Sequence, residues 1–490
     1  MDSGQFGVLK PAGPFRIATE LRLAGFSTQC VDIGPLRLGV KPSNLEILLR
    51  IIKKFITAET LWIGISTTYM DDLFGIRISK NTNVKSEILE SFIDQCRQIN
   101  PKIKFITGGS RIYSLGHYGF YTFAGPADKD IVEFTHWCKD SSYNPNIHLE
   151  NLTVKCKEYD QFVTSKIIWQ VEDIIFKGES LPIEISRGCI FKCKFCAFPL
   201  NGKTKGEWIK HADILLAEFL RNYELFGTTD YIFSDDTYND SVEKLEFLYS
   251  NVYSQLPFKL TFTTYLRLDL LYRFKQTEDI LKNSGLKSAI FGLETLDNNN
   301  AKIIGKGMNV EKQLDYLHVL KEDKFKDILI GSGFIAGLPY DTKESLLAMK
   351  EFLLSEHNPL DNWIVNPLQI NPGHAGMDKS YYSEFDKESE KYGYTILDDD
   401  PSLFPGVNWE LRSNNLNYYD CQTMAKETNN LSAEATNFKF GAFAWPRILT
   451  IIQNQSDLLE LNRRSIINKY DLGKMIHQRN LDYYDRLFKI

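Results

Sequence analysis

The stretch "EISRGCIFKCKFCAFP", residues 184–199, places Cys189, Cys193 and Cys196 at C-x3-C-x2-C spacing. It overlaps the end of a short apolar run, "PIEIS" (182–186), that has the composition of a buried strand. Three thiols this close together indicate a metal-binding loop. The strand before them is also the first of a repeating series, and that series decides the fold of the central part of the chain.

Strand-like runs alternate with helical segments six times between residues 181 and 370. The strand candidates are "PIEIS" (182–186), "YIFSD" (231–235), "LTFTTYL" (260–266), "SAIFGLE" (288–294), "ILIGSGFIAG" (328–337) and "WIVNPLQI" (363–370). Helical segments include 212–227, 241–255 and 343–357. Six βα units predict a partial (βα)6 TIM-type barrel, two units short of a complete one, with its chemistry where the strands end. The three cysteines then lie at the barrel mouth.

A second alternation precedes the barrel. Strand candidates at 6–9, 28–33, 61–67 and 103–109 are separated by helical segments such as 15–25 and 86–101. This pattern predicts an α/β domain with a Rossmann-like doubly wound parallel sheet. Ligands of such sheets bind at the carboxyl ends of the strands, so "KPAGP", "DIGPL", "STTYMDD" and "GGSRIYS" are candidate ligand-binding segments.

The length of 490 residues predicts two or three domains, because single cores rarely grow beyond ~250 to 300 residues. We assign 1–150 to the Rossmann-like domain, 151–180 to a linker and 181–370 to the barrel. Residues 371–490 are expected to form a mostly helical C-terminal region that covers the substrate side of the barrel, with helical segments at 431–455 and 464–478.

The composition is that of an ordinary globular protein, with 43% hydrophobic and 24% charged residues. The formal net charge of −6 does not indicate binding to nucleic acid or to an anionic membrane. No secretory signal is visible, and no apolar run approaches the ~18 residues that span a bilayer. We therefore expect a cytoplasmic protein. Five scattered cysteines are interpreted as small buried hydrophobic residues of a reducing compartment, Cys30, Cys96, Cys138, Cys156 and Cys421.

Three clustered thiols suit an iron-sulfur cluster better than zinc. A structural zinc site needs four ligands, but the chain has no second C-x2-C, and the nearest histidine, His211, lies fifteen residues after Cys196. A 4Fe-4S cube held by three thiolates leaves one iron open to a small molecule. Nearby cations, Arg187, Lys192 and Lys194, would moderate its negative charge. Zinc with a fourth ligand from a distant segment is the alternative.

The cysteine spacing after the first strand of a six-strand βα series resembles the radical S-adenosylmethionine superfamily, whose motif usually has an aromatic residue where this chain has Phe195. The resemblance implies that Cys189, Cys193 and Cys196 ligate three irons and that S-adenosylmethionine chelates the fourth. It further implies that one electron from the cluster cleaves the sulfonium to methionine and a 5′-deoxyadenosyl radical. An electron donor of flavodoxin or ferredoxin type is then an expected partner.

The same resemblance suggests further cofactor contacts at successive strand ends. Asp235 and Asp236 in "FSDDTYN" would lie near cofactor or substrate, Arg267 would pair with the cofactor carboxylate, and Glu294 would accept hydrogen bonds from ribose. The turn "GFIAGLPYDT" (333–342) would lie beside adenine, shaped by Gly337 and Pro339. Helix caps and solvated loop positions are the alternative interpretation of the charged residues.

The N-terminal segments resemble, in order, the cobalamin-binding domain that precedes the barrel in one large subclass of the superfamily. They are "FRIATELRLAGFSTQCVDIG", "ETLWIGISTTYMDD", "INPKIKFITGGSRIYS" and "YTFAGPADKDIVEF". The motif D-x-H-x-x-G, whose histidine lies below cobalt, is missing, so no residue is assigned as a cobalt ligand. A degenerate domain without cofactor is the alternative.

Three functional hypotheses follow. The first is a cobalamin-dependent radical methyltransferase, in which methylcobalamin gives a methyl group to a substrate carbon radical at an unactivated position. The second is a radical enzyme without cobalamin that performs a rearrangement, a cyclisation or a sulfur insertion. The third is a non-catalytic iron-sulfur protein that binds a partner. The substrate, a small molecule or a peptide, is not specified by the sequence.

Overall fold

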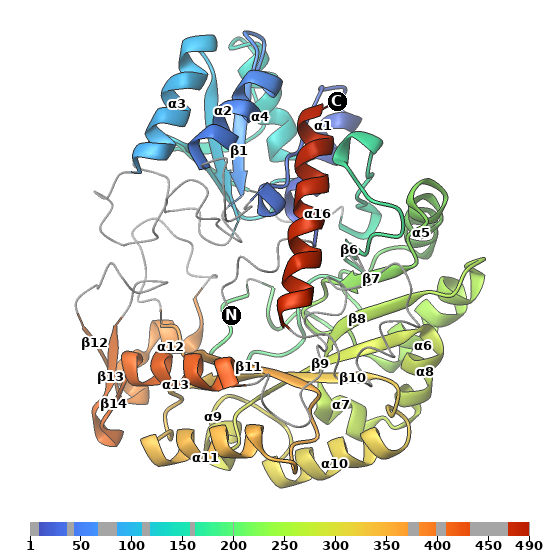
Figure 1. The fold of residues 1–490 in the computed structure, drawn as a ribbon, viewed down its shortest axis with the longest axis vertical. Helices are drawn as coiled ribbons and strands as arrows, with labels where there is room; N and C mark the ends of the chain where they lie inside the picture. The colour runs from blue at the N-terminus through green and yellow to red at the C-terminus, as the bar shows by residue number, and fades with distance from the viewer. Residues whose placement is uncertain are drawn as a thin grey trace.

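The computed structural model describes residues 9–36, 44–66, 86–109, 118–156, 162–198, 200–370, 382–397, 408–431 and 469–489. Figure 1 shows a smaller N-terminal α/β domain above a larger one, with a long C-terminal helix beside them. Several predicted features lie outside the described residues: 6–8 of the first strand candidate, most of "STTYMDD" and "GGSRIYS", residues 432–455, and 464–468 of the last helical segment.

The larger domain is built on one six-stranded sheet. Its strands are β6 (Leu181–Ile183), β7 (Asp230–Phe233), β8 (Thr261–Leu266), β9 (Leu286–Glu294), β10 (Leu329–Ala336) and β11 (Asn362–Pro367). They follow the order β11-β10-β9-β8-β7-β6, and every neighbouring pair is parallel. Each of the six predicted strands overlaps one of these, so the partial (βα)6 barrel is confirmed.

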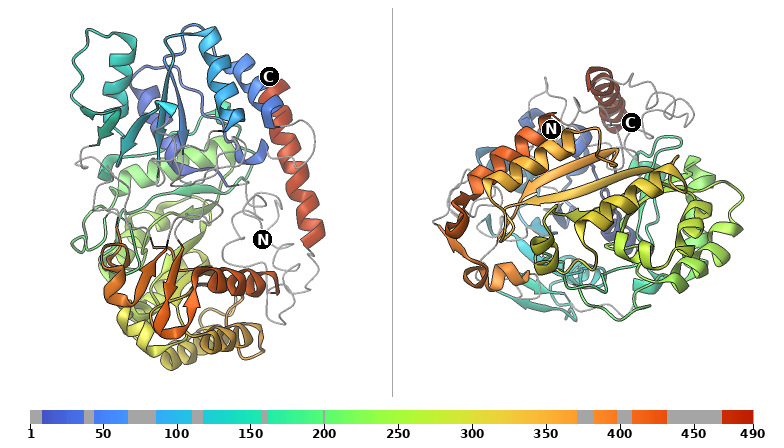
Figure 2. Two further views of the ribbon diagram at one scale, coloured as in Figure 1. Left: turned by 90° about the vertical axis from the view of Figure 1, so that its left-hand side faces the viewer. Right: turned by 90° about the horizontal axis from the view of Figure 1, so that it is seen from below.

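Helices cover the outside of this curved sheet, as the view from below in Figure 2 shows. They are α5 (Ala212–Phe226), α6 (Val242–Asn251), α7 (Leu268–Arg273), α8 (Gln276–Ser284), α9 (Asn298–Ile303), α10 (Val310–Glu322) and α11 (Lys343–Leu354). Local sequence fixes their ends. The Ser241 side chain accepts the Lys244 N–H at the start of α6, and Gly227 ends α5 in the left-handed region at φ +67°. The three predicted helical segments are confirmed.

The N-terminal domain has a five-stranded sheet in the order β1-β2-β3-β5-β4. Its strands are β1 (Trp62–Ser66), β2 (Lys104–Gly108), β3 (Tyr121–Ala124), β4 (His148–Glu150) and β5 (Thr153–Lys155), all parallel except β4. Its helices are α1 (Ala12–Leu23), α2 (Asn44–Phe55), α3 (Glu87–Ile99) and α4 (Asp130–Lys139). The strands predicted at 61–67 and 103–109 and the helices predicted at 15–25 and 86–101 are confirmed.

Alternating residues of β2 show how this sheet is covered. Phe105 belongs to the apolar core formed with α2 and α3, whereas Ile106 packs with residues of α1 and α4 on the opposite face. Both faces are buried, as expected of a parallel sheet between helices. The domain therefore has the predicted doubly wound architecture.

Two sequence predictions about this domain are wrong. Residues 28–33 form no strand, because the segment bonds to side chains instead of a strand partner: the Asp32 N–H donates to the Tyr483 hydroxyl at 3.0 Å. The boundary at residue 150 cuts between β4 and β5, which pair across a tight turn and complete the sheet. The linker starts only after them and is tied to α1 by a bidentate ion pair between Arg22 and Asp173 at 2.9 and 2.7 Å.

Most described residues of the C-terminal region lie in helices, as predicted, but the region also contains a small sheet. Residues 394–417 include a three-stranded sheet of β12 (Tyr394–Ile396), β13 (Trp409–Leu411) and β14 (Leu416–Asn417). Helix α13 (Tyr418–Leu431) follows and protects the edge strand β11. The Asn429 side chain there accepts from the Val365 N–H at 2.9 Å and donates to the Val365 carbonyl at 2.8 Å, as a neighbouring strand would.

The last helix, α16 (Lys469–Lys489), returns to the N-terminal domain. Figure 2 shows it along the side of the molecule. Tyr483 and Leu487 are buried in the same apolar core as α2 and α3. The assignment of all of 371–490 to the substrate side is therefore wrong for this helix, whose apolar residues complete the N-terminal core. No helix among the described residues is long and apolar enough to cross a bilayer.

Candidate functional site

The cysteine loop leaves β6 and closes on itself. The Cys189 N–H donates to the Leu200 carbonyl at 3.1 Å, and the Cys189 carbonyl accepts from the Gly202 N–H at 2.7 Å. Gly188 makes this closure possible, because it has φ +77° and a Cβ there would lie 2.7 Å from Leu200. Cys193 and Cys196 form a turn inside the loop, with the Cys196 N–H on the Cys193 carbonyl at 3.0 Å.

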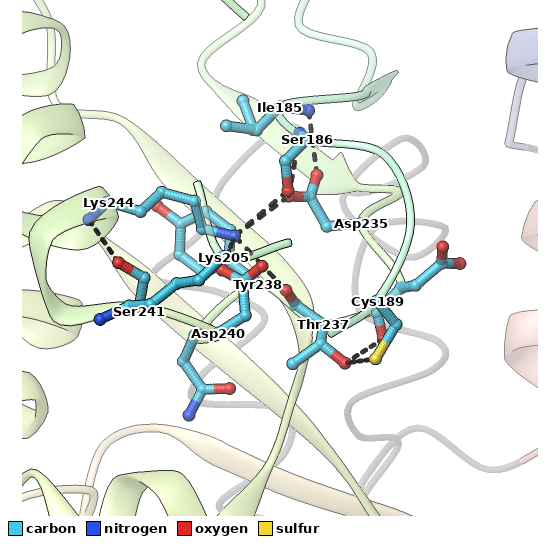
Figure 3. Close-up of polar contacts among 12 residues, drawn as sticks. Ile185, Ser186, Cys189, Lys205, Asp235, Thr237, Tyr238, Asp240, Ser241 and Lys244 are labelled. Atoms are coloured by element: carbon cyan, nitrogen blue, oxygen red, sulfur yellow. Dashed lines mark hydrogen bonds and ion pairs between the residues drawn. The ribbon is translucent and has the colours of Figure 1, made fainter. Parts of the chain in front are cut away.

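Asp235 anchors the start of this loop. Its carboxylate accepts from the backbone N–H groups of Ile185 and Ser186 at 2.9 and 3.0 Å and from the Ser186 hydroxyl at 2.5 Å (Figure 3). Only 1% of the residue is exposed. Because both oxygens are occupied by the loop it supports, we do not retain the interpretation of Asp235 as a cofactor contact. It joins the end of β7 to the end of β6.

Two lysines with buried side chains, Lys244 and Lys203, complete the support of the cysteine loop that Asp235 begins. Lys244 of α6 lies 2.5 Å from Asp240 and 3.9 Å from Asp235 and donates to the Ser186 hydroxyl at 3.2 Å (Figure 3). Lys203 donates to the Arg187 carbonyl at 2.8 Å, and burial lowers its pKa. Buried charges are tolerated only when they are paired in this way. The cysteine loop therefore rests on a buried polar network.

Each of the three thiols has one polar side chain beside its sulfur. The Thr237 hydroxyl lies 3.2 Å from Cys189 Sγ, the Asn201 amide nitrogen lies 3.1 Å from Cys196 Sγ, and the Arg267 guanidinium lies 3.5 Å from Cys193 Sγ. Burial raises the pKa of the Cys189 and Cys196 thiols. Thiols become metal ligands by losing their protons, and neighbouring donors stabilise the thiolates that form.

Asp236, in contrast to Asp235, lies beside the thiols with a half-buried side chain. Burial raises its pKa to about 6, helped by the charges of Asp235 and Glu184. Of the two carboxylates predicted here, Asp236 is the one without a full set of hydrogen bonds to the supporting loop.

Arg267 is the N-cap residue of α7, directly after β8, and is already paired. Its guanidinium binds both oxygens of Asp269 at 2.9 and 2.6 Å and stacks on the Phe191 ring at 3.8 Å. The Asn239 side chain holds the backbone of Arg267 on both sides, accepting its N–H at 2.8 Å and donating to its carbonyl at 2.9 Å. A cofactor carboxylate would have to share this guanidinium with Asp269, which the sequence analysis did not foresee.

Glu294 ends β9 in an unusual conformation. Its φ is +71°, in the left-handed region that costs a residue with a side chain about 1 to 3 kcal/mol. Its carboxylate contacts Lys306 at 3.5 Å and lies over Gly292, where a Cβ would come within 2.5 Å. Gly292 pairs in register with Gly333 of β10. The two glycines give the sheet a flat surface beside a strained carboxylate, as expected at a binding site.

The remaining predicted residues are Phe195, Gly337 and Pro339, whose contacts in the structure are with the core and with the C-terminal sheet. Phe195 is half-buried against the barrel core. Gly337 has φ +97°, and a Cβ there would lie 2.4 Å from the Trp409 ring. The Pro339 carbonyl accepts from Asn414 at 3.1 Å. The turn after β10 therefore packs on the C-terminal sheet, and its predicted place beside adenine stays a prediction.

The donor set fits an iron-sulfur cluster. Among the described residues, no three or more Cys, His, Asp or Glu side chains are arranged to hold one metal ion. A cubane does not require such an arrangement, because each thiolate bonds a different iron. The loop offers three half-buried thiols, each with a polar neighbour, and the network that supports it is buried and hydrogen-bonded.

Sequence reasoning missed several residues that build the site. Thr237, Asn239 and Asp240 belong to the run "DDTYND" after β7, of which only the first two residues were singled out. The uninterrupted polar run after a buried strand was the available signal. Asn201, Asp269 and Lys244 carry no local signal, because their roles depend on which segments the fold brings together.

Residues 183–353 match the family described as the Radical SAM superfamily. The chain is also 27% identical over 183 residues to the "Uncharacterized methyltransferase PH0819" of Pyrococcus horikoshii, and this match covers 36% of the chain and 38% of that protein. The chain therefore matches less than half of the length of that curated relative. The predicted family is confirmed for the barrel.

The fold is similar to two solved structures. The radical S-adenosylmethionine methyltransferase TsrM from Kitasatospora setae, with tryptophan substrate and a SAM analog bound, has a TM-score of 0.56 at 14% identity, over 81% of this chain and 78% of that chain. The cobalamin-dependent S-adenosylmethionine radical enzyme OxsB, with aqua-cobalamin and S-adenosylmethionine bound, has a TM-score of 0.51 at 16% identity, over 80% and 55%. At these identities the likeness shows the fold, and the predicted fold class is confirmed.

Proposed function

Because residues 183–353 form a radical SAM domain, we propose that the chain is a radical S-adenosylmethionine enzyme, and that it is a cobalamin-dependent methyltransferase acting on an unactivated carbon. One observation carries the proposal: Cys189, Cys193 and Cys196 lie on a loop anchored at the end of the first strand of a six-stranded parallel sheet. The chemistry of this fold lies at that edge.

Cys189, Cys193 and Cys196 would hold three irons of a 4Fe-4S cluster. When bound, the cluster and S-adenosylmethionine supply an electron and a 5′-deoxyadenosyl radical. The protein's part is to place these groups and to exclude water. The buried ion pairs of Lys244 and Lys203 keep the loop in place, and a buried apolar core fills the barrel.

Glu294 is the residue we assign to S-adenosylmethionine. Its carboxylate is held over Gly292 and Gly333, beside the Lys306 ammonium, and its strained backbone is what a preorganised binding residue shows. Asp236 and Arg267 contribute charge at the same edge of the sheet. The Arg267 guanidinium keeps Asp269 as its partner and would offer a carboxylate its remaining donors.

The N-terminal domain would hold cobalamin at the carboxyl ends of its strands. Gly108 ends β2 with open space where a Cβ would lie, and Gly109 and Gly125 follow strands with φ of +109° and +101°. Such glycines let a bulky ligand approach the backbone closely. When bound, cobalamin supplies the methyl carrier. The fold shared with TsrM and OxsB supports this assignment over a degenerate domain.

The substrate is proposed to be a small molecule or a peptide, and the electron donor a protein of flavodoxin or ferredoxin type.

The test begins with anaerobic reconstitution of the full chain with iron and sulfide. We expect four irons per chain and cluster absorption, both lost when Cys189, Cys193 and Cys196 are changed to Ala and both kept in the control Cys138→Ala, whose thiol lies in the N-terminal domain. Reduced protein should then form 5′-deoxyadenosine from S-adenosylmethionine. Tetrahedral zinc with complete protein ligation, or no 5′-deoxyadenosine, would contradict the radical function.

Cobalamin is tested separately. Hydroxocobalamin should stay with the protein through gel filtration, and methyl-labelled S-adenosylmethionine should label cobalamin. A protein that forms 5′-deoxyadenosine but retains no cobalamin would belong to the second class of hypotheses, radical enzymes without this cofactor.

A further inference from the structure

We propose that Thr237, Asn201 and Arg267 are positioning residues that hydrogen-bond the three cluster-binding sulfurs, one each, and thereby raise the reduction potential of the cluster. The inference rests on the proposed function, because it requires the cluster. Hydrogen bonds to cluster sulfurs stabilise the reduced state, which carries one more negative charge. The three contacts, at 3.2, 3.1 and 3.5 Å, come from three different segments of the barrel.

The Thr237 hydroxyl has two acceptors for one proton. It lies 2.8 Å from the Asp236 carbonyl, to which it donates, and 3.2 Å from Cys189 Sγ. A free Cys189 thiol can donate its own proton to the Thr237 oxygen. An iron-bound thiolate has no proton, so the sulfur becomes an acceptor and the hydroxyl must rotate toward it. Thr237 is therefore placed to respond to ligation.

The donors are held in place before any cluster binds. The Thr237 carbonyl accepts from the buried Lys244 ammonium at 3.4 Å, and Asn201 pairs with Cys189 in a bridge of two extended segments. Arg267 is fixed by Asp269 and by the Phe191 ring. Donors that are already ordered lose little conformational entropy when they bond to the sulfurs. The contacts that these residues make with groups other than the sulfurs thus hold the three donors in position for the cluster.

The experiment measures the potential of the cluster in the reconstituted full chain without S-adenosylmethionine, by redox titration followed by electron paramagnetic resonance. Thr237→Val removes the hydroxyl at nearly constant volume, and Thr237→Ser keeps it. Asn201→Leu removes the amide. The control is Thr264→Val, since the Thr264 hydroxyl is buried in β8 and has no hydrogen-bond partner within the described ranges.

At a fixed applied potential we expect the ratio of reduced to oxidised cluster to fall on the order of tenfold in Thr237→Val and in Asn201→Leu. For one electron, tenfold corresponds to about 59 mV. Thr237→Ser and Thr264→Val should titrate like the unchanged protein. Because Ser lacks the methyl group of Thr, Thr237→Ser would not restore the potential if the effect of Thr237→Val came from packing alone.

The inference is wrong if Thr237→Val and Asn201→Leu carry four irons and their clusters have the same reduction potential as the cluster of the unchanged protein. It is also wrong if Thr237→Val binds no cluster while Thr237→Ser does, because the hydroxyl would then be needed to build the site and not to tune it. If the unchanged protein itself binds no cluster, the proposed function fails, and the two failures are thereby distinguished.

Discussion

The buried ammonium of Lys244 provides the sharpest test of how the cysteine loop is supported. Its side chain is fully buried, at 0% exposure, and lies between Asp240 at 2.5 Å and Asp235 at 3.9 Å. Lys244→Met keeps the length of the side chain but removes the charge and the hydrogen bonds to the Ser186 hydroxyl and the Thr237 carbonyl. Asp235 would then lose its cation, and Asp240 would keep only the buried Lys203, at 3.6 Å.

Removing one partner of a buried ion pair costs about 3 to 5 kcal/mol, because the remaining charge is left uncompensated. Domains have a total stability of about 5 to 15 kcal/mol, so the loss is large. The matched control is Lys205→Met, which removes a lysine paired with Glu243 at 2.8 Å on the surface, where the two side chains are 54% and 72% exposed. We expect no measurable loss there, since solvent screens the pair.

The assay is urea-induced unfolding of the apoprotein, followed by tryptophan fluorescence, at pH 5 and at pH 7.5. The deficit of Lys244→Met should be larger at pH 7.5, because burial already raises the pKa of the Asp235 carboxyl, which can take up a proton at lower pH when its cation is lost. A second change, Asp240→Asn, should recover part of the deficit by removing one of the two charges. The reasoning is refuted if Lys244→Met loses no more stability than Lys205→Met, or if its deficit does not change with pH.

Three further substitutions test other parts of the structure. Asp173→Ala leaves Arg22 without its buried partner and should lower the free energy of unfolding, measured by chemical denaturation, by about 3 to 5 kcal/mol. The double variant with Arg22→Met should lose less, and equal losses in the single and double variants would contradict the pairing. Gly337→Ala should destabilise by about 1 to 3 kcal/mol more than Gly305→Ala in the same assay, because both have positive φ but only the first would collide with an indole ring of the C-terminal sheet. Burial raises the folded pKa of Asp32 to about 6, so its contribution to stability is complete below pH ~4 and declines as the pH rises through 6. Asp32→Asn should remove this decline, worth about 2 kcal/mol over the measured range, from unfolding curves measured between pH 4.5 and 7; parallel curves for both proteins would show that the group is not perturbed.

The local sequence pattern was sufficient to predict the strands and helices of the barrel. Most barrel strands are short and largely apolar, and such runs are expected because a parallel sheet is buried on both faces. The spacing of Cys189, Cys193 and Cys196 is likewise local, because one loop presents all three thiols. For the same reason the sequence indicated the cluster and the family before any contact was known. The segment 28–33 shows the limit of this reasoning, since its apolar residues suited a strand but its hydrogen bonds go to side chains.

What surrounds the thiols was decided by tertiary structure. Thr237, Asn201 and Arg267 are up to 66 residues apart in the sequence, and only the order of β6, β7 and β8 brings them to the three sulfurs. The role of Asp235 was also decided by tertiary structure. In the sequence its carboxylate looked free, but it accepts hydrogen bonds from backbone N–H groups at the end of the neighbouring strand. Helix α16 completes the N-terminal core from the far end of the chain. Patterns along a chain report which residues are buried, but they do not report which buried groups meet, because that depends on the free energy of the whole packed arrangement.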